Sequence, residues 1–233
     1  MKLLILDGDV TIWDISYIYD DVKEAVAKKF REVLGVEEEK VIEFIDDKVD
    51  VKRFKKYGPY LNRFFETLLI SYGHFLGDRD YDTTVEDFIR AQADRIPNAR
   101  PRVYPDAKIL EKLHQKGIKL AMLTSGDRTI QQTKLLSLPT WFKQVLDKTY
   151  VVYNKTADDY RAILKDFFVE PEETAVVGDS LERDLKPAYE VGISNLYLIE
   201  RKDRFFSLLN KTYGITDFAF KSIKSLEELE DLL

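Results

Sequence analysis

The sequence predicts an α/β protein whose core is a doubly wound, Rossmann-like parallel sheet, with an all-helical domain inserted into it. Short apolar runs recur along the chain, and helical periodicity separates them, as is typical of strands buried on both faces. Residues 16–98 form the exception, because their apolar residues keep helical spacing with no strand between them. We therefore expect an α/β core at 1–15 and 99–233 and a helical domain at 16–98.

The first predicted strand, residues 2–6, is an apolar run that stops at Asp7. The helical region then shows three apolar stripes, at 22–34, 41–45 and 61–72. A fourth helix follows Thr84, which has capping-box spacing to an aspartate three residues on.

The α/β pattern resumes after a connection that contains three prolines. The further strands predicted are 118–123, 174–177, 196–199 and 218–220. A helix is predicted after Asp127, and the further helices predicted are 106–116, 158–168, 183–191, 205–209 and 226–232.

Polar side chains follow three of these strands. Asp7 and Asp9 come after the first, Thr124 and Ser125 after the second, and Asp179 after the third. In an open parallel sheet the carboxyl ends of the strands face the ligand crevice. We expect these five residues to lie at one edge of the sheet.

The composition excludes several kinds of chemistry. The 233 residues include no cysteine, which removes disulfides, zinc thiolate sites, iron–sulfur clusters and thiol nucleophiles. The two histidines stand outside any two-histidine metal motif. The net charge of −6 is mixed along the chain, without the basic block that would indicate nucleic acid as a partner.

No segment has the run of about 20 apolar residues that a membrane span requires. The start of the chain is too short and too soon acidic for a signal peptide, so we expect a soluble, cytoplasmic protein. The high content of Lys, Arg and Glu, with only two Met, favours a thermophilic source that relies on surface ion pairs. Monomer and dimer both stay open.

Four segments together resemble the motifs of the haloacid dehalogenase superfamily. Residues 3–11 resemble its first motif, an apolar strand followed by D-x-D-x-[TV], and residues 120–124 are similar to the second. Lys155 resembles the third-motif lysine, and residues 176–184 resemble the fourth motif, G-D-x-x-x-x-D. The order fits, and the 24 positions from Lys155 to Asp179 leave room for one helix and one strand. The resemblance implies a phosphatase-like hydrolase of a small phosphorylated metabolite.

The resemblance also implies the catalytic roles. Asp7 would attack phosphorus and form an aspartyl phosphate, which water then hydrolyses. Asp9 would protonate the leaving oxygen and later take a proton from the attacking water.

Four further positions are implied to bind the phosphoryl group. Lys155 would bridge it to the nucleophile, the Thr124 hydroxyl would donate to one of its oxygens, and backbone amides around Ser125 and Gly126 would donate to the others. Ser180 is a candidate for holding Asp179 in place.

Several carboxylates at one edge of a sheet repel one another and an incoming phosphate dianion, so a cation is needed to compensate them. Mg²⁺, which prefers oxygen ligands, is the natural candidate. By resemblance, the side chains of Asp7 and Asp179 and the backbone carbonyl of Asp9 would hold it. Asp184 would be either a further ligand or a support for the others.

The sequence departs from the family pattern at two positions. Val10 stands where glycine is common, and Thr156 follows Lys155 where proline is common, but neither change removes a catalytic group. Asp9 favours phosphate-ester hydrolysis over halide removal, because dehalogenases of the superfamily lack an acid there.

Three alternative functions are compared with the phosphatase. A phosphomutase would share every motif and differ only in rebinding its product. A non-catalytic, phosphate-binding regulatory protein would be expected to have lost Asp7 or Asp9. A phosphoacceptor signalling domain would lack both the D-x-D pair and a helical insert of this size.

The helical insert is similar to the cap of the superfamily, which implies a mobile lid that selects the substrate. Trp13, Tyr17 and Tyr19 are candidates for lining a pocket or for ordinary packing. A basic group is a candidate for binding a second anionic group of the substrate or for a solvated helix face. Its members are Lys52, Arg53, Lys55, Lys56 and Arg63.

Overall fold

The computed structural model of the protein describes residues 1–58, 60, 62–202, 204–211 and 217–233. Its chain divides into two compact units. The α/β unit comprises Met1–Asp14 and Arg100–Leu233, and the helical unit comprises Ile15–Ala99. Leu61, the first residue of the third predicted stripe, lies outside the described residues.

The α/β unit is built on a six-stranded sheet in which neighbouring strands pair in parallel. The strand order is β5-β4-β1-β6-β7-β8. The strands are β1 (Leu3–Leu6), β4 (Lys119–Ser125), β5 (Lys148–Val152), β6 (Thr174–Gly178), β7 (Asn195–Ile199) and β8 (Lys221–Ile223). The predicted α/β fold class is confirmed, and β1 lies at the point where the strand order changes direction, which is where such sheets bind ligands.

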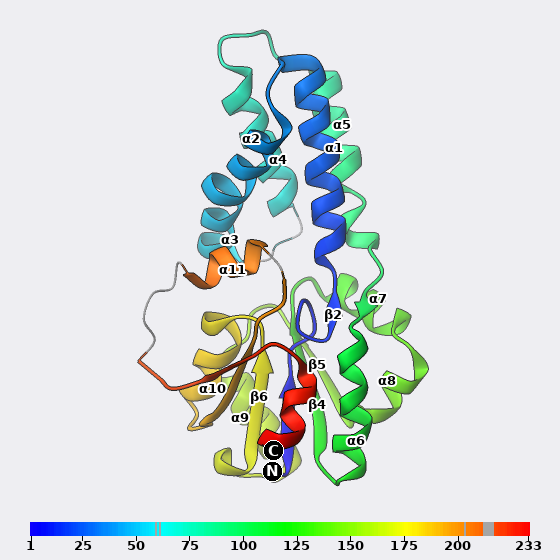
Figure 1. Cartoon of the computed structure of the whole chain (residues 1–233), viewed down its shortest axis with the longest axis vertical. Helices are drawn as coiled ribbons and strands as arrows, with labels where there is room; N and C mark the ends of the chain where they lie inside the picture. Colours follow the sequence, from blue (N-terminus) through cyan, green and yellow to red (C-terminus); the bar gives the residue numbers. More distant parts are fainter. Residues whose placement is uncertain (59, 61, 203, 212–216) are drawn as a thin grey trace. The chain divides into compact units, whose positions relative to one another are not determined.

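Helices pack on the sheet because successive residues of each strand point to opposite faces. On one face, Leu3 and Ile5 of β1 belong to the same hydrophobic core as apolar residues of α9 and α10. On the other side of the strands in Figure 1 lie α6 and α8, whose Leu110 and Phe142 are fully buried. The helices of the unit are α6 (Ile109–Gln115), α7 (Arg128–Ser137), α8 (Thr140–Val145), α9 (Ala157–Phe167), α10 (Lys186–Tyr189), α11 (Arg204–Lys211) and α12 (Leu229–Leu232).

Four short helical turns complete the unit, and they include a π-helical turn where the sequence predicts the start of helix 183–191. The turns are η3 (Pro105–Lys108), η4 (Pro171–Glu173), η5 (Leu181–Leu185) and η6 (Leu226–Glu228). In η5 the chain winds more widely than an α-helix before α10 begins.

Several predictions about the elements were wrong. The sequence analysis missed β5, and it missed the short antiparallel pair β2 (Trp13–Asp14) with β3 (Arg102–Val103). The last strand is Lys221–Ile223 and not 218–220, because Phe218 packs its ring on Tyr189 at 5.1 Å instead of joining the ladder.

The helical unit contains helices and no strand among its described residues, as predicted. Its core is formed by the predicted apolar stripes and includes Val22, Phe30, Leu68, Tyr72 and Ile89. Its elements are α1 (Ser16–Leu34), α2 (Glu38–Glu43), η1 (Phe44–Asp50, π-helical), α3 (Val51–Tyr57), α4 (Arg63–Leu76), α5 (Thr83–Ala93) and η2 (Ile96–Asn98).

The residue that caps α5 differs from the prediction. Asp82, not Thr84, is the N-cap, since its carboxylate accepts hydrogen bonds from both the backbone nitrogen and the hydroxyl of Thr84, at 2.8 and 2.7 Å. Thr84 is therefore inside the first turn of the helix.

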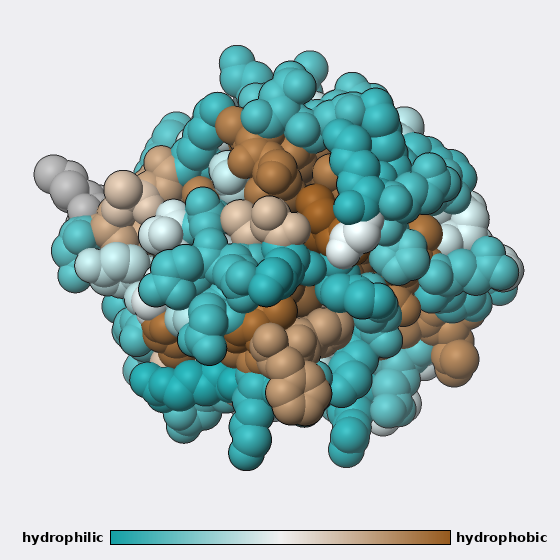
Figure 2. Space-filling view, turned by 90° about the horizontal axis from the view of Figure 1, so that it is seen from below, coloured by the Kyte–Doolittle hydropathy of each residue, from teal (hydrophilic) through white to brown (hydrophobic). Residues whose placement is uncertain are grey.

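The surface of the protein mixes hydrophobic and hydrophilic residues. On the face seen from below, Figure 2 shows several hydrophobic areas separated by hydrophilic residues. Within the described residues, no helix combines the length and the apolar character needed to cross a bilayer.

Candidate active site

The carboxyl ends of three neighbouring strands bring most of the predicted site residues together. Asp7 follows β1, Thr124 and Ser125 end β4, and Asp179 follows β6. Because β1 lies between β4 and β6, its carboxyl end is flanked by both of the others. Lys155 reaches the same place from the segment between β5 and α9.

Three carboxylates form a compact acidic group. Oxygen atoms of Asp7, Asp179 and Asp184 all lie within 4.8 Å of one another. All three residues are buried, with 8%, 6% and 2% of their surface exposed. Gly178 makes this packing possible, because a Cβ at that position would overlap the side chain of Asp184. We name Asp7, Asp179 and Asp184 the acidic triad.

Lys155 supplies the positive charge inside this group. Its Nζ donates a hydrogen bond to Asp7 Oδ1 and another, at 2.5 Å, to Asp184 Oδ1. Its side chain is only 2% exposed. The next residue, Thr156, is the N-cap of α9 in a capping box with Asp159, which fixes the point where the chain leaves Lys155.

One ammonium group does not balance three carboxylates. Burial, together with the negative charge of Asp184, raises the pKa of Asp7 to about 6 although Lys155 opposes the shift. Burial and the charges of Asp7 and Asp184 raise the pKa of Asp179 well above its usual value, although the charges of Arg183 and Lys155 oppose the shift. The acidic triad therefore lacks positive charge.

A divalent cation fits this deficit. Asp179 Oδ2 is buried and has no hydrogen-bond partner among the described residues, so one oxygen of the triad is left to bind something else. An all-oxygen donor set is the kind that Mg²⁺ prefers. Asp184 has less to offer, because Lys155 donates to its Oδ1 and the Ser180 backbone nitrogen donates to its Oδ2 at 3.0 Å.

Asp9 is not a member of the acidic triad and has different partners. Lys134 Nζ donates to both of its carboxylate oxygens, at 2.9 and 2.7 Å, and Gln131 Nε2 and Trp13 Nε1 donate at 3.0 and 2.6 Å. Burial alone would raise the pKa of Asp9, but the Lys134 charge and these donors outweigh it and hold the pKa below its usual value. The sequence analysis did not identify Gln131 or Lys134, because nothing local marks two polar residues on a helix as partners of a distant aspartate.

The predicted phosphate-binding residues have the following partners. Thr124 is 1% exposed and its hydroxyl lies 3.4 Å from Gln131 Oε1. The Ser125 hydroxyl accepts a hydrogen bond from Arg183. The Gly126 backbone nitrogen donates to Val152 O at 2.9 Å, so this predicted phosphate donor is used within the fold.

Ser180 supports Asp184 and not Asp179, contrary to the sequence hypothesis. Its backbone nitrogen donates to Asp184 Oδ2, and its hydroxyl accepts from the Arg183 backbone nitrogen to cap the π-helical turn. Asp179 is held through its backbone instead, where Asn210 Nδ2 of α11 donates to its carbonyl at 2.7 Å. The sequence analysis had no signal for Asn210.

The loop after β1 orients the Asp7 carboxylate. Thr11 Oγ1 donates to Asp7 Oδ2 at 2.8 Å, and Val10 takes a left-handed φ of 63° that β-branched residues rarely adopt. Gly8 allows the buried Trp13 ring to pack against the loop, because a Cβ there would overlap that ring.

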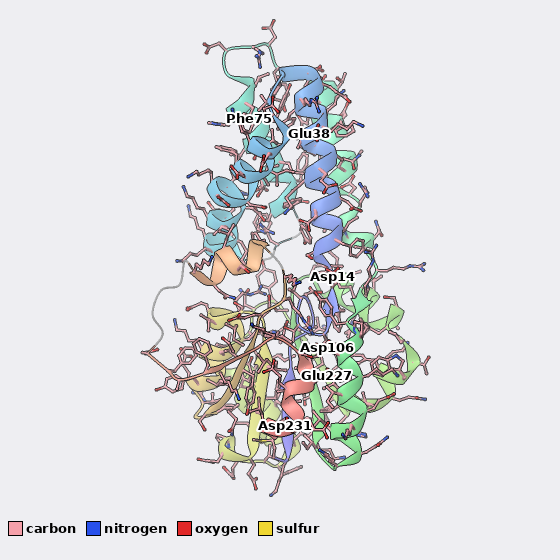
Figure 3. The ribbon with its side chains drawn as sticks, viewed as in Figure 1. Asp14, Glu38, Phe75, Asp106, Glu227 and Asp231 are labelled. Atoms are coloured by element: carbon pink, nitrogen blue, oxygen red, sulfur yellow. The ribbon has the colours of Figure 1, made fainter. Side chains whose placement is uncertain are left out.

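A partly buried arginine links this loop to distant segments of the chain. Arg201 donates to Thr11 O at 2.7 Å and to both carboxylate oxygens of Asp106. Asp106, labelled in Figure 3 near Glu227, also accepts from the Leu226 backbone nitrogen at 2.9 Å. The loop is thus bound to segments far from it in sequence.

Two members of the basic group of the helical unit form ion pairs within that unit. Arg63 is buried and forms an ion pair with Asp50, and Arg53 forms one with Glu66. Lys52, Lys55 and Lys56 are exposed. Of the three aromatic candidates, Trp13 contacts Asp9 as described, and Tyr19 packs edge-on against Phe64 at 5.0 Å.

The chain is similar to known phosphatases, two of which match it over nearly their whole length. A glyceraldehyde 3-phosphate phosphatase from Methanocaldococcus jannaschii is 24% identical over 238 residues, which cover 100% of this chain and 97% of that protein. One of the same name from Pyrococcus furiosus is 25% identical over 240 residues, covering 98% and 92%. A phosphoserine phosphatase from Thermus thermophilus is 29% identical over 145 residues, covering 60% and 55%.

Solved structures agree on the fold. A haloacid dehalogenase phosphatase from Thermococcus onnurineus aligns with a TM-score of 0.60 at 26% identity, over 100% of this chain and 97% of that one. A haloacid dehalogenase-like hydrolase from Xanthomonas campestris aligns with a TM-score of 0.73 at 13% identity, over 100% and 94%. The profile of the haloacid dehalogenase-like hydrolases matches residues 1–192 of the 233. The chain therefore belongs to the haloacid dehalogenase-like hydrolase family.

Proposed function

We propose that this protein is a Mg²⁺-dependent phosphatase that hydrolyses a small-molecule phosphate monoester through an aspartyl-phosphate intermediate. The observation that carries the proposal is the acidic triad with Lys155 paired to two of its members, Asp7 and Asp184, an arrangement suited to a nucleophile, a cation and a dianionic substrate. The phosphatases among its relatives support the choice of a phosphate ester as substrate.

In the first step, a carboxylate oxygen of Asp7 attacks phosphorus in line with the leaving group. The new Asp7 O–P bond forms while the P–O bond to the leaving group breaks, and the leaving oxygen takes a proton from Asp9. Asp9 has to be protonated for this step, although Lys134 and the other donors favour its ionised form in the free protein. An alcohol departs, and the phosphoryl group stays on Asp7.

In the second step, water attacks the phosphorus of the aspartyl phosphate. Asp9, now ionised, takes a proton from that water as the new P–O bond forms. The Asp7 O–P bond breaks, inorganic phosphate is released, and the Asp7 carboxylate is restored.

The residues around the phosphoryl group neutralise and orient it. Lys155 bridges Asp7 and the phosphate, and the Thr124 hydroxyl and the segment around Ser125 and Gly126 provide hydrogen-bond donors. The Gly126 nitrogen has to exchange its bond with Val152 O to take part. When bound, Mg²⁺ on Asp7, Asp179 and the Asp9 carbonyl supplies Lewis-acid charge stabilisation, and Asp184 supports this site.

The helical unit, Ile15–Ala99, is proposed to be the cap that selects the substrate. Its insertion directly after the strand that bears the nucleophile supports this role. The cytoplasmic location and thermophilic source indicated by the composition stay predictions, as does a state of monomer or dimer.

The test is phosphate release by the purified protein, with Mg²⁺ and with excess EDTA. The substrate panel includes p-nitrophenyl phosphate, glyceraldehyde 3-phosphate and phosphoserine, the last two because relatives carry their names. We expect release with Mg²⁺ and none with EDTA or in Asp7→Asn. Asp158→Asn, which alters an exposed aspartate of α9, is the matched control and is expected to keep full activity.

Two outcomes would contradict the proposal. Absence of phosphate release across a broad panel of monoesters rejects the phosphatase. Conversion of a sugar phosphate into its isomer, without free phosphate, identifies a phosphomutase instead.

A further inference from the structure

The carboxylate of Asp9 lies in a cradle of three donors that come from two separate parts of the α/β unit. Trp13 Nε1 of β2 donates to Oδ1 at 2.6 Å. Gln131 and Lys134 of α7, 122 and 125 positions along the chain, donate to the same carboxylate. We call these three residues the Asp9 cradle.

Lys134 is the charged member of the cradle, and it is buried. Its side chain is 8% exposed, whereas the Asp9 side chain is 25% exposed. A buried ammonium group is costly unless an anion faces it, so the position of Lys134 is bound to that of Asp9. Both contacts from Nζ are short, at 2.7 and 2.9 Å, which restricts rotation of the carboxylate.

The backbone of α7 places the two donors side by side. Gln131 and Lys134 are three positions apart, which puts them on one face of the helix. The helix begins beyond Asp127, whose carboxylate caps it by accepting from the Ile130 nitrogen at 3.1 Å. Because α7 follows β4 after a short turn, its first two turns stay close to the catalytic end of the sheet.

Gln131 also connects the cradle to the proposed phosphate-binding segment. Its Nε2 donates to Ser125 O at 3.0 Å as well as to Asp9, and its Oε1 lies 3.4 Å from the Thr124 hydroxyl. One side chain thus spans from the end of β4 to Asp9. Movement of Asp9 relative to the phosphoryl site is limited by this link.

We propose that Lys134, assisted by Gln131, is a positioning residue that sets the direction of the Asp9 carboxylate for proton transfer to the leaving group. The inference rests on the proposed function, in which Asp9 is the acid and base. Transfer of a proton needs the carboxylate within hydrogen-bond distance of the leaving oxygen, and a carboxylate free to rotate would meet this condition only part of the time. Gln131 and Lys134 lie outside the four motifs that place the chain in its family.

A purely structural role for Lys134 predicts different kinetics. If the ion pair with Asp9 only stabilises the fold, its loss lowers turnover of every substrate by the same factor. If Lys134 acts through the acid, the loss depends on the leaving group. An alkyl alkoxide must be protonated as it departs, whereas p-nitrophenolate leaves well without a proton.

The experiment compares kcat of wild type and Lys134→Met on p-nitrophenyl phosphate and on an alkyl phosphate, glycerol phosphate. We expect the variant to lose on the order of 100-fold on the alkyl phosphate, in the range of general acid catalysis, and less than about fivefold on the aryl phosphate. The KM values are expected to change little. Lys165→Met, an exposed lysine of α9, is the matched control and is expected to behave as wild type on both substrates.

A double variant shows whether Lys134 acts through Asp9. Asp9→Asn with Lys134→Met is expected to be no slower on the alkyl phosphate than Asp9→Asn alone, because the residue that Lys134 positions is already lost as an acid. Equal losses on the two substrates, or losses that multiply in the double variant, overturn the inference.

Gln131→Met provides a second variant that leaves no buried charge unpaired. The readout is the ratio of kcat on the alkyl phosphate to kcat on the aryl phosphate. Thr124 and Ser125 contact the phosphoryl group of both substrates, so an effect of the substitution on these contacts cancels in the ratio. We expect a ratio shifted in the same direction as in Lys134→Met and by a smaller factor, and an unchanged ratio counts against the inference.

These outcomes separate the inference from the function on which it rests. If wild type releases no phosphate from any ester, the proposed function fails. If Asp9→Asn shows no dependence on the leaving group, the acid role of Asp9 fails. If Asp9→Asn shows that dependence and Lys134→Met does not, only the positioning role of Lys134 fails.

Discussion

Thr11 fixes the rotation of Asp7: its Oγ1 lies 2.8 Å from Asp7 Oδ2 while Lys155 donates to Oδ1. Each oxygen of the proposed nucleophile therefore has its own donor. Thr11 itself is fully buried, and Arg201 donates to its carbonyl oxygen. The Thr11 side chain orients the Asp7 carboxylate, and the Thr11 backbone is itself held by the hydrogen bond from Arg201.

The first prediction concerns Thr11→Val, which keeps the shape of the side chain and removes the hydroxyl. A hydrogen bond to a charged group contributes about 1.5 kcal/mol, so we expect kcat to fall about tenfold. KM is expected to stay close to the wild-type value, because the bond acts on the nucleophile and not on the substrate. Steady-state kinetics check this, with Thr11→Ser as the variant that keeps the hydroxyl; a fully active Thr11→Val contradicts the prediction.

The second prediction concerns the charge deficit of the acidic triad. The folded-state pKa of Asp179 lies above its usual value of 3.8, so folding takes up a proton there and the group lowers the stability above about pH 4. Asp179→Asn removes this penalty and is expected to raise the free energy of unfolding by about 1 kcal/mol in EDTA at pH 7.5.

Adding Mg²⁺ should make the wild-type protein more stable than Asp179→Asn. Mg²⁺ binds the folded wild-type protein and raises its melting temperature, whereas Asp179→Asn lacks a ligand and should show little response. Thermal unfolding with and without Mg²⁺ measures both effects independently of activity. A wild-type protein that is insensitive to Mg²⁺ and to Mn²⁺ would falsify the metal site.

The third prediction concerns the left-handed backbone of Val10. Residues other than glycine lose about 1–2 kcal/mol in this conformation. Comparing Val10→Gly with Val10→Ala separates this strain from the lost burial, which is nearly the same in both. We expect Val10→Gly to be more stable than Val10→Ala by about 1 kcal/mol in urea unfolding.

A helix interior gives the opposite order and serves as the control. At Val22 of α1, Ala is expected to be more stable than Gly by about 1 kcal/mol. The same sign at both positions would mean that Val10 carries no strain.

The fourth prediction concerns the acid sensitivity of the fold. Asp147 accepts from the Leu120 backbone nitrogen and from Lys119 Nζ, each at 2.9 Å. Burial opposes ionisation, but these donors outweigh it and lower the pKa of Asp147 below 3.8. A lowered pKa gives stability that is complete above about pH 4 and is lost as the pH falls through the folded-state pKa.

Asp147→Asn should therefore lose about 1 kcal/mol of unfolding free energy at pH 7, and this difference from wild type should shrink toward pH 3. Urea unfolding across this range measures it. Exposed Asp158→Asn is the control, and a difference for Asp147→Asn that is constant with pH contradicts the assignment.

The sequence predicted the parts of the fold that are marked by local pattern. Strands β1, β4, β6 and β7 each contain a run of buried apolar residues, and they were found because burial on both faces leaves no alternation of polar and apolar residues within that run. The edge strand β5 was missed because Lys148 and Thr149 are exposed and its remaining residues are only half-buried. An edge strand with one partner needs no continuous apolar run.

The residues of the candidate site also fall into two groups, those that a local sequence pattern marks and those that it does not. The motif residues could be named from order and spacing, and the structure brings Asp7, Lys155, Asp179 and Asp184 together. Gln131 and Asn210 could not be named, since each is a polar residue on a helix whose partner lies elsewhere in the chain. Such pairs depend on tertiary packing, which local periodicity does not contain.

The strand order has a consequence for synthesis on the ribosome. The first strand made, β1, pairs with β4 and β6, so both of its neighbours in the sheet emerge more than 100 residues later. The contiguous helical unit is complete before either of them exists. The nascent chain therefore holds an apolar strand without a partner until residues 119–125 leave the tunnel, a period in which protection by a chaperone would matter most.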